Sequence, residues 1–130
     1  MLKALFLDMD ETLCDTYAAN QKATQLLGEE LNTLYNAAFD GQAVARAYVL
    51  GMYRQWSDSQ RARYLPLIEQ RGEGGFRLQL ICDLLAERNI ERPDEDTAQA
   101  LLDKFDKDRL EAFHFYPGIQ EFLEEARKLF

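Results

Sequence analysis

Two carboxylates stand one residue apart near the start of the chain, directly after an apolar run. Asp8 and Asp10 follow the apolar residues 4–7. A continuous apolar run of this kind is typical of a strand buried in a parallel sheet. Strand residues i and i+2 share a face, and α/β proteins bind ligands at the carboxyl ends of such strands. The spacing therefore predicts two acids that act on one ligand.

The chemistry open to this pair is phosphoryl transfer assisted by a divalent cation. A carboxylate can attack phosphorus and form an aspartyl-phosphate, which makes Asp8 the candidate nucleophile. Asp10 would protonate the leaving group and later activate water. Two neighbouring carboxylates also attract Mg²⁺, which takes water and phosphate oxygens as its other ligands and neutralises charge. The hydroxyl of Thr12 can steady the loop that carries both acids.

Residues 5–13, Leu-Phe-Leu-Asp-Met-Asp-Glu-Thr-Leu, resemble the first signature of the haloacid dehalogenase superfamily, a hydrophobic strand followed by Asp-x-Asp-x-Thr or Val. The resemblance implies that Asp8 is nucleophile and Mg²⁺ ligand. It implies that Asp10 is general acid and base and offers its main-chain carbonyl to the metal. Met9 and Thr12 would support the phosphate-binding loop. Because members that cleave carbon–halogen bonds lack an acid at the second position, phosphoryl transfer is favoured.

Helical patterns occupy nearly all of the chain after the acidic loop. Asp15 can cap the first helix, and the glycines within residues 71–75 predict a flexible loop. Nothing outside residues 3–8 looks like a second buried strand. Apolar residues at three-to-four spacing predict helices over residues 16–39, 42–56, 58–70, 76–89 and 93–110, and a last helix that opens at residues 116–118, with Ile119, Phe122, Leu123 and Ala126 facing inward.

The resemblance implies an α/β fold class, with a Rossmann-like core that carries an inserted all-α cap domain. Residues 1–16 would form the first core strand and the nucleophile loop. Residues 17–112 would form the helical cap, which in subfamily I closes over the active site and selects substrate. Residues 113–130 are similar to the Pro-Gly helix that leads into the second core strand.

The later motifs of the superfamily have no counterpart in this sequence. A phosphate-binding Ser or Thr, a Lys and a final acidic pair all follow the second core strand in the family, and the sequence stops at residues 128–130, where that strand should begin. We therefore expect the N-terminal portion of a longer enzyme, with the remainder of the core absent. Such a portion should be a poor catalyst on its own.

Arg77 is the candidate residue for substrate selection. It follows the glycine-rich residues 72–75, and glycines allow a backbone to approach a ligand closely. A guanidinium can also pair with an anion. A plain interhelical loop with a solvated arginine is the alternative.

Composition excludes several classes of partner. The net charge of −8, from 15 basic and 23 acidic residues, disfavours nucleic acid. No apolar run approaches the roughly 20 residues that span a bilayer, and the acids that follow the short N-terminal run exclude a signal peptide. We therefore expect no membrane partner and a cytoplasmic location. Cys14 and Cys82 lie in no metal-binding spacing and should be small buried side chains.

The sequence as a whole predicts a Mg²⁺-dependent phosphomonoesterase that acts through Asp8 on a small phosphorylated metabolite. A sugar-phosphate mutase is the second prediction, because relatives similar to β-phosphoglucomutase share the signature and the cap. The third is a non-catalytic helical module that binds a partner or self-associates. An unpaired apolar strand at residues 3–8 would invite pairing with another copy of the chain.

Overall fold

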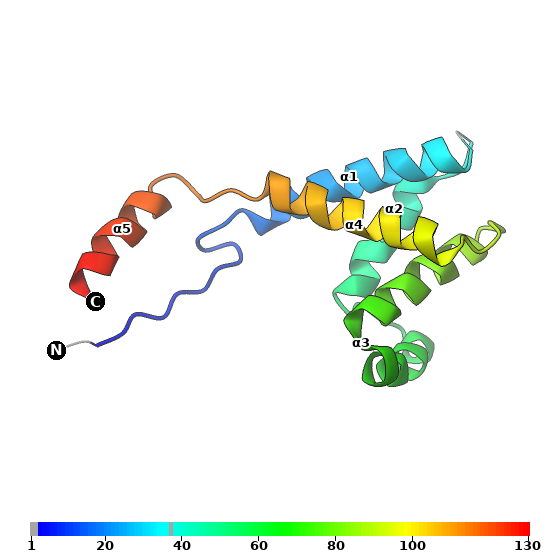
Figure 1. Cartoon of the computed structure of the whole chain (residues 1–130), viewed down its shortest axis with the longest axis horizontal. Coiled ribbons are helices and arrows are strands. Elements are labelled where there is room, and N and C mark those ends of the chain that lie inside the picture. Colours follow the sequence, from blue (N-terminus) through cyan, green and yellow to red (C-terminus); the bar gives the residue numbers. More distant parts are fainter. Residues whose placement is uncertain (1–2, 37) are drawn as a thin grey trace.

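Five helices follow one another in the computed structural model, which describes residues 3–36 and 38–130. Helices α1 to α4 form one body, in which α1 packs against α2 and α4, and α3 packs against the same two helices (Figure 1). Residues 1, 2 and 37, which belong to the predicted first strand and first helix, lie outside the described residues. The bounds are Thr16–Leu34 for α1, Gly41–Met52 for α2, Asp58–Ala86 for α3, Glu95–Ala112 for α4 and Ile119–Leu129 for α5.

The interior of this body is filled by the apolar stripes of its four helices. On α1 the buried side chains recur every four residues, so that one face of the helix is turned inward. The rings of Tyr48 and Phe105 join α2 to α4 edge to face, with centroids 5.4 Å apart. The predicted burial of Cys14 and Cys82 is confirmed, and both are free thiols. Each fully buried large side chain stabilises the body by roughly 1.5–3 kcal/mol.

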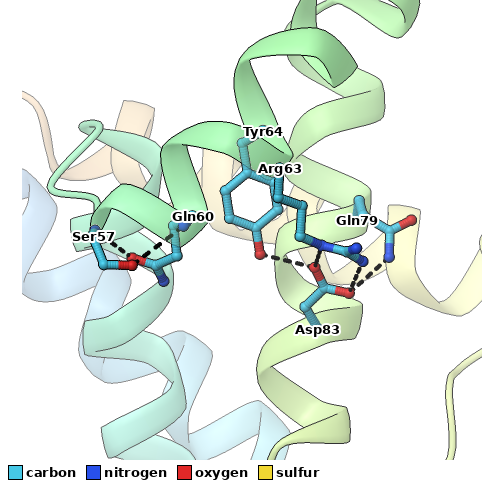
Figure 2. A network of polar contacts seen from close by, with 6 residues as sticks. All are labelled: Ser57, Gln60, Arg63, Tyr64, Gln79 and Asp83. Carbon is cyan, nitrogen blue, oxygen red and sulfur yellow. Dashed lines mark hydrogen bonds and ion pairs between the residues drawn. The ribbon is translucent and has the colours of Figure 1, made fainter.

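Each helix of the body begins at a side chain that accepts a hydrogen bond from its first turn. The predicted cap is confirmed at Asp15, whose carboxylate accepts the N–H of Ala18 at 3.0 Å. Ser57 forms a capping box with Gln60, in which each side chain bonds the backbone of the other (Figure 2). Asp40 and Asp94 cap α2 and α4 in the same manner.

Helix α3 is bent sharply at Gly72, which has φ 71° and ψ −177°. A straight helix would separate residues 63 and 83 by about 30 Å, yet the Asp83 carboxylate accepts bonds of 2.7 and 2.9 Å from Arg63. The hydroxyl of Tyr64 and the amide of Gln79 also donate to Asp83, so the two halves of α3 lie against each other (Figure 2). The predicted loop over residues 71–75 is therefore reduced to one non-helical residue.

The predicted α/β fold class is wrong, because residues 3–36 and 38–130 contain no strand and no sheet. Residues 3–8 instead run as an extended trace away from the helical body (Figure 1), and the side chain of Phe6 is 94% exposed. A strand needs a neighbour for its N–H and C=O groups, and the described chain supplies none. Only two isolated bridges form, from Cys14 to Asp10 and to Phe115. The described residues thus show no Rossmann-like core.

Helix α5 packs against none of the other helices of the described chain. The predicted burial of its apolar face is wrong, since no residue of α5 is buried and Phe122 is 46% exposed. The helix follows Gly118, which has a left-handed φ of 83° that glycine adopts readily. No described helix combines the length and the apolar character needed to cross a membrane.

Candidate functional site

The acidic loop folds back on itself between the extended segment and α1. The carbonyl of Met9 accepts the N–H groups of Leu13 at 2.9 Å and of Cys14 at 3.1 Å, and the N–H of Glu11 returns to the Cys14 carbonyl at 3.0 Å. Glu11 has a φ of 58°, in the left-handed region that a non-glycine residue enters in tight turns. These hydrogen bonds fix the backbone at Met9, the residue between Asp8 and Asp10.

The Asp8 side chain is exposed and has one hydrogen-bond partner. The Thr12 hydroxyl donates to Asp8 Oδ2 at 3.3 Å, so Oδ1 has no partner among the described residues. Sequence reasoning gave Thr12 this loop-steadying task, and the structure places its hydroxyl beside the carboxylate. A carboxylate held by one oxygen, with the other oxygen accessible, has the arrangement that an attacking nucleophile needs.

Asp10 is tied to the first residue of α1. The Thr16 hydroxyl, on a side chain that is largely buried, donates to Asp10 Oδ1 at 2.8 Å. The carboxylate therefore lies at the N-terminus of a helix, where the partial positive charge of the backbone favours an anion. Asp10 and Asp8 thus differ in their surroundings, because one is anchored to the helical body and the other only to its own loop.

Residues between α4 and α5 also form hydrogen bonds to the acidic loop. The Tyr116 hydroxyl donates to Glu11 Oε2 at 2.9 Å, and the backbone N–H of Tyr17 donates to Glu11 Oε1. The hydrogen bond to Glu11 raises the pKa of Tyr116 to about 12. The N–H of Tyr116 also donates to the Leu13 carbonyl at 2.9 Å, and that of Asp15 to the His114 carbonyl at 3.1 Å. None of these contacts between residues 114–117 and the acidic loop was predicted from the sequence.

The oxygen donors of Asp8 and Asp10 are of the type that Mg²⁺ prefers. They come from two carboxylates, and within the described residues no group of three His, Cys, Asp or Glu side chains is arranged to hold a metal ion. One Asp10 oxygen already accepts the Thr16 hydroxyl. The residues present thus match the donor chemistry of Mg²⁺, but two carboxylates alone do not make a metal site.

Arg77 is partly buried among the helices of the body and does not lie at the acidic loop. Its guanidinium forms two bonds to the Asp106 carboxylate, at 2.7 and 3.0 Å, and donates to the Tyr48 hydroxyl at 2.7 Å. Burial raises the pKa of Tyr48 to about 12, against the opposing effect of Arg77. These contacts connect α2, α3 and α4, and none of them joins Arg77 to Asp8 or Asp10. The structure thus does not bring the candidate residue for substrate selection to the candidate nucleophile.

Comparison with protein-family models, with curated proteins and with solved structures found no match to this chain.

Proposed function

We propose that this chain carries the nucleophile and the general acid and base of a Mg²⁺-dependent phosphomonoesterase that acts on a small phosphorylated metabolite. The observation that carries the proposal is the loop Asp8-Met9-Asp10-Glu11-Thr12, in which one carboxylate is exposed and the other is anchored. The proposed location is the cytoplasm, because both cysteines are free thiols, which is usual in a reducing compartment.

The two acids divide the proposed reaction between them. Asp8 attacks phosphorus, the bond from phosphorus to the leaving oxygen breaks, and protonated Asp10 gives that oxygen its proton. Asp10 then takes a proton from the water that attacks the aspartyl-phosphate, which releases phosphate and restores Asp8. Mg²⁺, when bound, would neutralise the negative charge of the phosphoryl group.

Hydrolysis of p-nitrophenyl phosphate tests this proposal. We expect slow turnover that requires Mg²⁺ and stops with EDTA, and covalent phosphate on the peptide that contains Asp8, detected by mass spectrometry after acid quenching. Asp8→Asn should abolish both signals, and Asp10→Asn should slow turnover by about 10²–10⁴-fold. Asp96→Asn, at an exposed carboxylate in the first turn of α4, is the matched control. Equal rates for the Asp8→Asn variant and the unmodified chain would disprove the nucleophile.

A mutase remains the alternative within the same chemistry. Both reactions start with the same aspartyl-phosphate, so the fate of a sugar phosphate distinguishes them. Free inorganic phosphate as the product supports the phosphomonoesterase, and an isomerised sugar phosphate supports the mutase.

Self-association is a second candidate function, and the exposed apolar residues at both ends of the described chain favour it. Leu5, Phe6 and Leu7 are 45%, 94% and 40% exposed, and an unpaired apolar segment can add to a second copy. Size-exclusion chromatography at two protein concentrations should then give a dimer that Phe6→Gln converts to a monomer. Leu110→Gln, at an apolar residue of α4 that is 75% exposed, should leave the dimer intact. An unmodified chain that stays monomeric would exclude this candidate.

A further inference from the structure

A groove of about 940 Å³ runs between α1 and α2, on the part of the body next to the acidic loop. Residues three or four apart on each helix share a face, and each helix lines the groove with one such stripe. Helix α1 supplies Tyr17, Gln21 and Thr24, α2 supplies Arg46 and Leu50, and Tyr53 follows directly after α2. The volume is within the range of sites that hold small molecules.

Two glycines bring the helices together beside Gln42, which lines the groove. A Cβ atom on Gly41 would lie 2.4 Å from the carbonyl oxygen of Gly28, and one on Gly28 would lie 2.2 Å from the Gln42 amide nitrogen. From this contact α2 runs obliquely across α1 (Figure 1). At the opposite end is Tyr17, whose backbone N–H donates to Glu11 of the acidic loop. The lining therefore includes Tyr17, which is bonded to the loop, and Gln42, which lies beside the glycine contact.

The charge of the groove is opposite to that of the chain. The chain carries a net charge of −8, yet the only ionised side chains among the residues that line the groove are Lys22 and Arg46. Both are exposed, and neither forms an ion pair or a hydrogen bond with another described residue. Elsewhere on the body Arg63, Arg77 and Lys104 are paired with carboxylates. Two unpaired cations, with no acid among the residues that line the groove, favour an anionic ligand.

The remaining lining indicates what such an anion would carry. Val49 and Leu50 present aliphatic surface, and Tyr17 and Tyr53 present aromatic rings, with Leu50 55% exposed. Flat aromatic or aliphatic groups bury such surface from water.

We propose that the groove between α1 and α2 binds a small organic anion, with its charged group on Arg46 and Lys22 and its apolar body against Leu50 and Tyr53. Carboxylates and phosphates share this chemistry, because both accept hydrogen bonds from guanidinium and ammonium groups. Binding at this groove requires neither Mg²⁺ nor Asp8, so it stands apart from the proposed phosphomonoesterase.

Titration of the complete chain with three phenyl compounds, followed by the shifts of its backbone amide NMR signals, tests the proposal. Phenyl phosphate, phenylacetate and uncharged 2-phenylethanol share a ring and differ in charge. Without Mg²⁺ we expect one or both anions to shift amides of residues 17–25 and 42–53, with a Kd of about 1 mM or tighter. A phosphate-only or a carboxylate-only response identifies the preferred anion.

Two variants separate this groove from other positive sites. We expect the double variant Lys22→Gln, Arg46→Gln to bind the preferred anion at least about tenfold more weakly, or about 1.4 kcal/mol. Arg61→Gln, at an exposed arginine of α3, should leave the Kd unchanged within about twofold. The proposal is overturned if the groove amides do not shift, if 2-phenylethanol binds as tightly as the anions, or if the double variant binds like the unmodified chain.

Discussion

The carboxylate of Asp83 is the most densely bonded acid in the described part of the chain, and its ionisation couples stability to pH. Burial acts to raise its pKa, but the hydrogen bonds from Arg63, Gln79 and Tyr64 outweigh burial and hold the pKa of Asp83 below its usual value. The same acid joins the two halves of α3 (Figure 2). Protonation of Asp83 therefore weakens the contact that keeps α3 folded on itself.

The first prediction concerns the pH dependence that follows from this acid. Since the pKa is lower in the folded than in the unfolded chain, the stabilisation is complete above the unfolded value of about 4 and is lost as pH falls through the folded pKa. Urea denaturation from pH 7 down to pH 2 should show a steeper loss of the free energy of unfolding for the unmodified chain than for Asp83→Asn. At pH 7 the variant should be about 1–3 kcal/mol less stable. Parallel pH profiles for the two proteins would contradict this account.

The residue scale also explains which parts of the candidate site could be found from sequence. The contact from Thr12 to Asp8 is local, so a short motif was enough to suggest it. The bond from Tyr116 to Glu11 joins positions 105 residues apart, and no periodicity encodes such a pair. Arg77 shows the same limit, because its acidic partner, Asp106, lies on another helix.

At the scale of single elements, the bend of α3 depends on one glycine. Gly72 combines φ 71° with ψ −177°, a conformation that is almost confined to glycine. Gly74, two residues later, is helical, and a Cβ atom on either glycine would meet no atom within 4 Å. The two positions therefore differ in backbone conformation and not in available space.

The second prediction uses this pair of glycines. Gly72→Ala should lower the free energy of unfolding by about 1–3 kcal/mol, because alanine is strained at this φ and ψ. Gly74→Ala should leave stability unchanged or raise it by about 0.5–1 kcal/mol, since alanine favours a helix over glycine. Urea denaturation of both variants measures the difference. Equal losses at the two positions would show that conformation at Gly72 is not what bends α3.

Helices, whose patterns are local in the sequence, were predicted well, whereas the strand, which requires a neighbouring strand, was predicted wrongly. Helix caps and apolar stripes depend on residues that are close in the sequence, so the observed bounds of the helices in the body are near the predicted ones. The run at residues 4–7 indicates a tendency to be buried, but a strand also needs a neighbour, and the described chain offers none. A glycine-rich stretch at residues 71–75 suggested a break, but only the backbone shows that one residue makes it.

At the scale of the whole molecule, the packed body of α1 to α4 contrasts with the two ends of the described chain. The body holds the buried core, whereas residues 3–10 are exposed and α5 has no buried residue. Segments with few packed contacts open more readily than a core and are cut first by proteases.

The third prediction is that chymotrypsin will remove both ends before it enters the body. Brief digestion at low protein concentration should cleave near Phe6 and within residues 113–122, leaving a resistant fragment of about residues 7–113. Mass spectrometry identifies the fragment, and digestion in urea, where the body is unfolded, should cleave throughout. Early cleavage within α1 or α4 would show that the body is not the stable unit.

The backbone bridge between Cys14 and Phe115 joins the two chain segments that flank the helical body. Helices α1 to α4 all lie in the chain between residues 14 and 115, and the backbone of these two residues is paired. The acidic loop is also bonded to α1, through Thr16 and Tyr17, so a change in the position of α1 relative to this bridge would move Asp10 and Glu11 with it.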